Sequence, residues 1–79
     1  MLPILLDLAS LKVVLVGEGE AAEKRLSLLD EAGAARLEAY SSAPSEAFAR
    51  QAGKRLKGAR PADEVLTGAG IVFLAGLGD

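Results

Sequence analysis

The sequence contains no cysteine and no histidine. Without cysteine no disulfide can form, and without either residue a zinc or non-haem iron site would have to consist of carboxylates alone. We therefore expect no metal site in this chain.

Basic residues and long apolar runs are also scarce. Nine lysines and arginines stand against eleven aspartates and glutamates, giving a net charge of -2. No basic stripe could release counterions from a phosphate backbone, so nucleic acid is not an expected partner. No run approaches the roughly 18 apolar residues of a membrane span, and the opening M-L-P-I-L-L-D-L lacks the basic start and cleavage pattern of a signal peptide. We expect a cytoplasmic protein that does not bind a membrane.

The composition is that of a small globular domain. The 79 residues are 51% hydrophobic and 25% charged, which is ordinary for a folded protein. A chain this short buries only roughly 60 to 65% of the surface that it exposes when unfolded. We expect one domain, residues 1–79, of modest stability.

Apolar periodicity predicts strands alternating with helices. Strands are expected at residues 12–16, 36–41, 54–56 and 71–75, and helices at residues 20–32, 42–53 and 61–66. The first and last strands are apolar without alternation, which is typical of parallel strands covered on both faces. Gly33 stands where a left-handed residue would end the first helix. Regular alternation of this kind predicts a parallel sheet in an α/β fold.

Two glycines join the first strand to the first helix, in the stretch V-V-L-V-G-E-G-E-A-A-E-K-R-L that begins at Val13. In this context Gly17 would make the sharp turn, Gly19 would let the backbone approach a diphosphate, and Ala22 would let the helix pack closely on the sheet. The diphosphate would lie on the amides near Glu20 and Ala21 at the helix N-terminus. The alternative is a turn that needs glycine for its geometry only.

Two glutamates flank this turn. Glu20 lies in the first helical turn, where the helix dipole stabilises a carboxylate with or without a ligand. Glu18 would stand close to a bound diphosphate and repel it. We therefore expect the Glu18 side chain to point to solvent.

The end of the second strand carries serines where NAD sites usually have an acidic residue. Ser41 and Ser42 could accept either a ribose hydroxyl or a phosphate, which leaves NAD and NADP both open. Equally, the two serines could cap the following helix. Glu38 lies in mid-strand and must find a partner there.

These features together predict a Rossmann-like three-layer fold with a four-stranded parallel sheet, half of a doubly wound NAD-binding domain. The chain resembles the N-terminal domain of siroheme synthase, the precorrin-2 dehydrogenase and sirohydrochlorin ferrochelatase family. The matching segments are L-P-I-L-L-D-L from Leu2, V-V-L-V-G followed by Gly19, Ala22, Lys24 and Arg25, L-L-D-E-A-G-A from Leu28, and R-P-A-D-E-V-L from Arg60 through Ala75. The chain departs from the family at Glu18, which replaces a glycine, at L-E-A-Y in the second strand, and at A-G-L-G-D from Ala75, where the family has Ala-Thr-Asp-Asp.

The resemblance implies a cofactor and a substrate. Family members bind NAD after the glycine pair and at the end of the second strand, which correspond here to Glu20, Ala21, Ser42 and Ala43. The family removes two hydrogens from precorrin-2 and passes a hydride to NAD, and bifunctional members also insert ferrous iron. We therefore expect NAD as cofactor and the set Gly17, Gly19, Glu20, Ala21, Ser41, Ser42 and Ala43 as its binding residues.

The aspartate implicated in the family's chemistry and the family's dimerisation domain both lie beyond the region that this chain matches. We therefore expect a domain that is incomplete at its C-terminal end, has no catalytic residue and meets a tetrapyrrole only in a longer form. The alternative is a Rossmann-like interaction module that has lost its cofactor. An exposed sheet edge also predicts self-association, as a homodimer.

Overall fold

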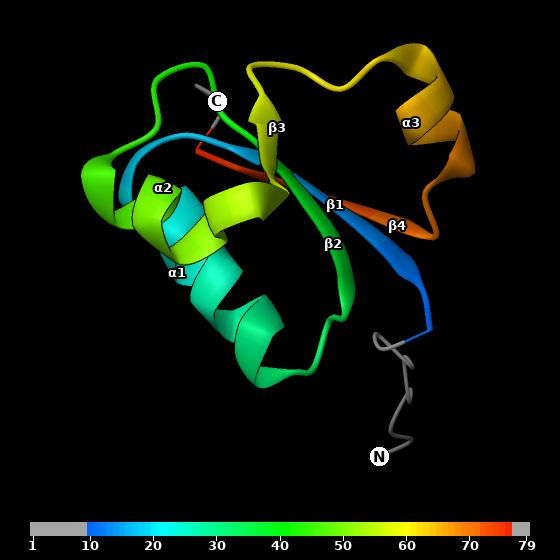
Figure 1. The fold of residues 1–79 in the computed structure, drawn as a ribbon, viewed down its shortest axis with the longest axis horizontal. Helices are drawn as coiled ribbons and strands as arrows, with labels where there is room; N and C mark the ends of the chain where they lie inside the picture. Colours follow the sequence, from blue (N-terminus) through cyan, green and yellow to red (C-terminus); the bar gives the residue numbers. More distant parts are fainter. Residues whose placement is uncertain (1–9, 77–79) are drawn as a thin grey trace.

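The computed structural model describes residues 10–76 and contains four strands and three α-helices in alternation (Figure 1). The elements are β1 (Lys12–Gly17), α1 (Gly19–Glu31), β2 (Arg36–Tyr40), α2 (Glu46–Ala52), a 3-10 turn (Gly53–Arg55), β3 (Leu56–Gly58), α3 (Asp63–Gly68) and β4 (Ile71–Ala75). Among residues 10–76, no helix has the length and apolar character needed to cross a membrane. The match to the segment that begins at Leu2 lies outside the described residues.

The four strands form one parallel sheet in the order β3-β2-β1-β4. Successive side chains of a strand point to opposite faces. Leu15 and Phe73 point toward α1 and α2, whereas Val16 and Leu74 line a cleft with Leu66 of α3. The sheet therefore lies between α1 and α2 on one face and α3 on the other (Figure 1). The predicted α/β, Rossmann-like class is confirmed.

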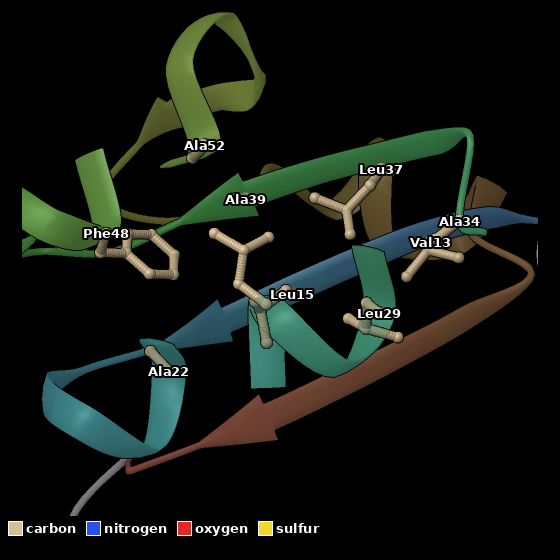
Figure 2. Close-up of a cluster of buried hydrophobic side chains, with 10 residues drawn as sticks. Val13, Leu15, Ala22, Leu29, Ala34, Leu37, Ala39, Phe48 and Ala52 are labelled. Carbon is tan, nitrogen blue, oxygen red and sulfur yellow. The ribbon is translucent and has the colours of Figure 1, made fainter. Parts of the chain in front are cut away.

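The core lies between the sheet and the helix pair α1 and α2 (Figure 2). β1, α1, β2, α2 and the loop between α1 and β2 contribute hydrophobic side chains that are buried to 9% exposure or less. They are Val13, Leu15, Ala22, Leu26, Leu29, Ala34, Leu37, Ala39, Phe48 and Ala52. Burial of aliphatic and aromatic side chains at about 25 cal/mol per Å² is the main force that holds this layer together.

The opposite face of the sheet is only partly covered by the described residues. Val72 is 38% exposed and Leu74 is 67% exposed, and α3 buries none of its side chains. The prediction that residues 71–75 are covered on both faces is therefore wrong for this face. An unbroken apolar run does not distinguish a strand between two helix layers from a strand under one.

Local signals account for the C-terminal end of α1 and the N-terminal end of α2, the second at a later serine than predicted. Gly33 has φ +86°, and the amides of Gly33 and Ala34 donate to the carbonyls of Asp30 and Leu29, so the predicted left-handed ending of α1 is confirmed. The helix expected from residue 42 starts four residues later, because its N-cap is Ser45, whose Oγ accepts from the Phe48 amide at 3.0 Å.

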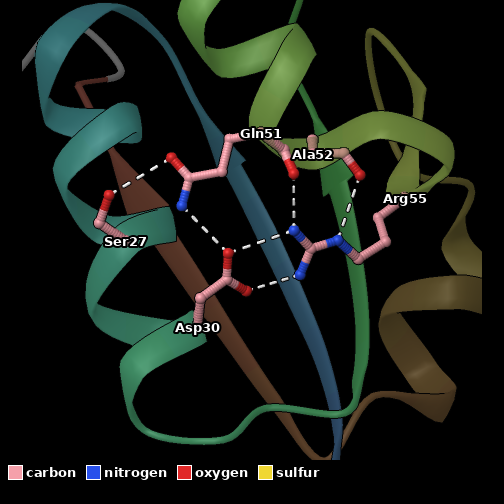
Figure 3. A network of polar contacts seen from close by, with 5 residues as sticks. All are labelled: Ser27, Asp30, Gln51, Ala52 and Arg55. Atoms are coloured by element: carbon pink, nitrogen blue, oxygen red, sulfur yellow. Dashed lines mark hydrogen bonds and ion pairs between the residues drawn. The ribbon is translucent and has the colours of Figure 1, made fainter.

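A polar cluster explains why β3 begins two residues later than predicted. Arg55 donates to the carbonyls of Gln51 and Ala52 and pairs with Asp30 on α1 at 2.6 Å (Figure 3). Gln51 also donates to Asp30 and accepts from Ser27. These bonds hold residues 53–55 in a 3-10 turn against α1, so the strand can start only after Arg55.

Replacing Arg55 with alanine is expected to lower the free energy of unfolding by about 1.5–3 kcal/mol, because it removes charge-assisted bonds at a half-buried site. Arg50→Ala is the matched control. Arg50 pairs with Glu46 at 2.6 Å, but these side chains are 77% and 86% exposed, so its loss should cost about 0.5 kcal/mol or less. Urea denaturation measures both values, and equal losses in the two variants would show that the cluster does not stabilise the fold.

Glu38 finds the partners that its mid-strand position requires. It accepts a hydrogen bond from the Tyr40 hydroxyl at 2.9 Å and lies 3.7 Å from the Lys12 ammonium. Burial, followed by the nearby Glu38 carboxylate, raises the pKa of Tyr40 above its usual range. Glu38 therefore has a structural role, on the face of the sheet that α1 and α2 do not cover.

Candidate functional site

The first glycine of the turn is required by close packing. A Cβ on Gly17 would lie 2.6 Å from the Ala75 carbonyl oxygen and 2.9 Å from the Ala22 Cβ. Ala22 itself is 1% exposed, as its predicted role in close helix packing requires. Gly17 does not have the positive φ of the glycines that turn the chain, so the sharp turn expected there lies two residues later.

Gly19 makes the turn and leaves the space beside it open. Its φ is +64°, and apart from the adjoining residues and the backbone of its own helix no described atom lies within 4 Å of the position that a Cβ would take. The amides of Gly19, Glu20 and Ala21 have no acceptor among residues 10–76, and Glu20 and Ala21 are exposed. Free amides in the first turn of a 13-residue helix can bind an anion.

Glu18 does not point to solvent, which corrects the prediction made for it. Its carboxylate reaches the segment that follows β2 and accepts four hydrogen bonds there. Ser41 Oγ and the Ala43 amide donate to Oε1 at 2.9 and 3.2 Å, and the Ser42 amide and Oγ donate to Oε2 at 2.9 and 2.8 Å. The carboxylate thereby connects the two segments that a dinucleotide would span.

These donors also set the charge state of Glu18. The Ser42 amide has the largest effect, followed by the hydroxyls of Ser42 and Ser41, and together with the Ala43 amide they lower the pKa of Glu18 from 4.5 to about 2 against an opposing effect of burial. Glu18 is therefore an anion at any pH at which the protein would work.

Stability should depend on pH through this carboxylate. Because the pKa of Glu18 is lower in the folded chain, its contribution is complete above pH 4.5 and is lost as the pH falls toward 2. Glu18→Gln should therefore be less stable than the wild type at neutral pH, with a difference that shrinks across this window. Urea denaturation at several pH values measures it. Glu31→Gln, at an exposed position of α1, is the control, and a difference for Glu18→Gln that stays constant with pH would contradict the assignment.

The remaining predicted residues follow β2. The structure brings Ser41, Ser42 and Ala43 together around one carboxylate, and it places Ser41 at 5% exposure. Neither Ser41 nor Ser42 caps α2, since Ser45 does so. The capping alternative for this serine pair is therefore wrong.

An open cleft of about 720 Å³ lies at the carboxyl edge of the sheet, next to the turn. Its lining combines the ends of β1 and β4 with the segment between β3 and α3. The lining residues are Val16, Glu18, Ser42, Ala59, Arg60, Pro61, Asp63, Leu66, Leu74 and Gly76. In open parallel sheets ligands bind at this edge where the strand order reverses, and here the reversal falls between β1 and β4.

Sequence reasoning missed most of the cleft. Asp63 and Leu66 were assigned to a short helix and Arg60 to a segment that matches the family, but none of them to the site, although a segment that follows a parallel strand must emerge at the same edge as the glycine turn. That topological signal was present. Gly76 was also missed, and a Cβ there would lie 3.2 Å from the Ala21 Cβ, so the segment after β4 packs directly on the start of α1.

The fold, the glycine turn and the cleft at the strand ends define a Rossmann-type dinucleotide-binding domain. Comparison with protein families supports this class, because the family described as "Putative NAD(P)-binding" matches residues 4–77. The chain belongs to this family, whose domain is also found at the N-terminus of siroheme synthase. Comparisons with curated proteins and with solved structures gave no significant match.

Proposed function

We propose that this domain binds NAD as the cofactor-binding portion of a siroheme-synthase-like precorrin-2 dehydrogenase, and that it is not active alone. The observation that carries the proposal is the family match over residues 4–77, on a chain whose glycine turn is open beside a cleft at the strand ends. The resemblance to siroheme synthase supplies the substrate, and the cytoplasm is the proposed location.

The residues of this chain would bind and orient the cofactor. The diphosphate would lie on the amides of Gly19, Glu20 and Ala21, where it takes up donors that the helix leaves free. The adenosine would extend into the cleft past Ser42. Hydride transfer is chemistry that the bound NAD supplies, and we assign no catalytic role to any residue of this chain.

The second candidate is an interaction module that has lost its cofactor. The observation that favours it is the saturation of Glu18, since a carboxylate offers about four lone-pair positions and four donors already occupy them. In an interaction module, Glu18 would occupy the donors of the segment after β2, and these donors would not be available to bind a ribose.

Calorimetric titration of the purified chain with NAD separates the two functions. The proposal predicts one saturable site with a dissociation constant in the millimolar range or tighter. A thermal shift should accompany binding, because a ligand at ten times its dissociation constant stabilises the folded state by about 1.4 kcal/mol. Absence of both heat and thermal shift at millimolar NAD would reject the proposal in favour of the interaction module.

The dehydrogenase assignment has its own readout. The chain mixed with precorrin-2 and NAD should produce no NADH absorbance, because a site that holds cofactor and substrate in contact needs more protein than this domain provides. Turnover by the chain alone would show that it contains catalytic groups that we have not assigned.

We also propose that the chain self-associates through the edge of β4. Among residues 10–76 this strand pairs only with β1, and Leu74 is 67% exposed on it. Exposed strand edges pair readily with other chains. Light scattering should therefore give a mass near that of a dimer at high concentration, and a monomer under the same conditions would refute this prediction.

A further inference from the structure

The carboxylate of Glu18 lies where dinucleotide-binding domains read the adenosine ribose, although it arrives there from an unusual direction. In the common arrangement an acidic residue at the end of the second strand binds the ribose 2′-hydroxyl. Here the end of β2 offers serines, and the carboxylate comes from the turn between β1 and α1. The carboxylate therefore comes from a different segment, but it lies at the end of β2, where the usual acidic residue would bind the ribose.

On the basis of the proposed dinucleotide site, we propose that Glu18 selects NAD over NADP by accepting the 2′-hydroxyl of the adenosine ribose. The contacts allow this exchange without moving the carboxylate. Ser42 is exposed, so its hydroxyl can turn to water and release a lone pair on Oε2. The Ser41 hydroxyl and the amides of Ser42 and Ala43 continue to hold the side chain.

The same position is unfavourable for NADP. A 2′-phosphate would replace a hydroxyl that donates with a dianion that cannot, directly against an ionised carboxylate. Among residues 10–76, those with charged side chains that line the cleft are Glu18, Asp63 and Arg60, so two carboxylates face one cation there. The lowered pKa of Glu18, at about 2, means that protonation does not relieve the repulsion at neutral pH.

The remainder of the cleft suits the base that the ribose carries. Val16, Pro61, Leu66 and Leu74 line it with apolar surface beside Glu18 and Ser42. Its volume of about 720 Å³ lies in the usual range for small-molecule sites, roughly 300–1,000 Å³. An adenine ring on these side chains would place its ribose at the edge of the cleft that Glu18 forms.

The test compares the affinities of the whole chain for NAD and NADP by calorimetry. The wild type should bind NAD at least tenfold more tightly than NADP. Glu18→Gln keeps the size of the side chain and removes its charge, so it should bring the two affinities to within about threefold, mainly by strengthening NADP binding. Glu31→Gln removes the same charge at an exposed position outside the site and should keep the wild-type ratio.

Glu18→Gly is the second variant, and it frees the two serine hydroxyls and two amides to bind a phosphate. It should prefer NADP, with thermal melting confirming that the variant is folded. Equal wild-type affinities, or an unchanged ratio in Glu18→Gln, would overturn the selectivity role and leave dinucleotide binding intact. Tighter NAD binding by Glu18→Gly than by the wild type would show that Glu18 blocks the ribose position, which also overturns it. A wild type that binds neither dinucleotide would instead reject the proposed function itself.

Discussion

Replacing Gly19 with alanine is expected to weaken NAD binding at least tenfold, which corresponds to about 1.4 kcal/mol of binding free energy. The new Cβ would enter space that the described residues leave empty, and this is the space through which a diphosphate must approach the first amides of α1. Because no other part of the described chain lies within 4 Å of the new methyl group, apart from the adjoining residues and the backbone of its own helix, crowding among the described residues does not explain the loss. Calorimetry of the variant measures it.

Gly33 provides a closely matched control at the opposite end of the same helix. It also has positive φ, +86° against +64° for Gly19, and a Cβ there would likewise meet no other described part of the chain within 4 Å. Each substitution should cost about 1–2 kcal/mol of stability, since both force alanine into the left-handed region. Only Gly19→Ala should lose affinity. Equal affinities in the two variants would mean that the turn does not contact the dinucleotide.

Gly17→Ala is expected to destabilise the domain by about 1–3 kcal/mol. The added methyl group meets the Ala75 carbonyl oxygen at 2.6 Å, and that oxygen also accepts the Glu18 amide at 2.9 Å. Relief of the contact therefore requires β1 and β4 to separate. At roughly 0.05–0.15 kcal/mol per residue, a 79-residue chain has only about 4–12 kcal/mol of stability to lose.

Gly68→Ala is the control for Gly17→Ala. Gly68 ends α3 and lacks positive φ, and a Cβ there would meet no described residue outside its own helix turn within 4 Å. Alanine is the better helix former, so this variant should be unchanged or slightly more stable. Chemical denaturation of both variants decides the matter. If Gly17→Ala unfolds at the wild-type midpoint, the added methyl group does not clash with β4, which would contradict this prediction.

The order of elements and the parallel sheet could be predicted because they depend on local signals. The apolar runs before Gly17 and after Gly70, the helical spacing of Ala22, Leu26 and Leu29, and the left-handed Gly33 are each readable within a few residues. Boundaries failed where a distant group decides them. Arg55 delays the start of β3 by two residues by binding Asp30, which lies 25 positions away in the chain.

The glycine turn was predicted, but the direction of Glu18 was not. Repulsion between a bound diphosphate and the Glu18 carboxylate predicted a side chain that points to solvent, because that orientation keeps the two negative charges apart. The structure shows a stronger influence, since four donors from residues 41–43 attract the same carboxylate. Hydrogen bonds between residues 23 to 25 positions apart leave no periodic signal, and so no pattern in the sequence indicated them.

In the proposed site the turn at Gly19 holds the diphosphate of a dinucleotide, and the segment after β2 holds its adenosine ribose. Titration of isotope-labelled protein with NAD, followed through backbone amide resonances, tests this claim directly. The amides of Gly19, Glu20, Ala21, Ser42 and Ala43 should all shift and saturate with one dissociation constant, while those at the far end of α1 stay in place. If these five amides do not move, or if the shifts fall only on other surfaces, the dinucleotide site described here is contradicted.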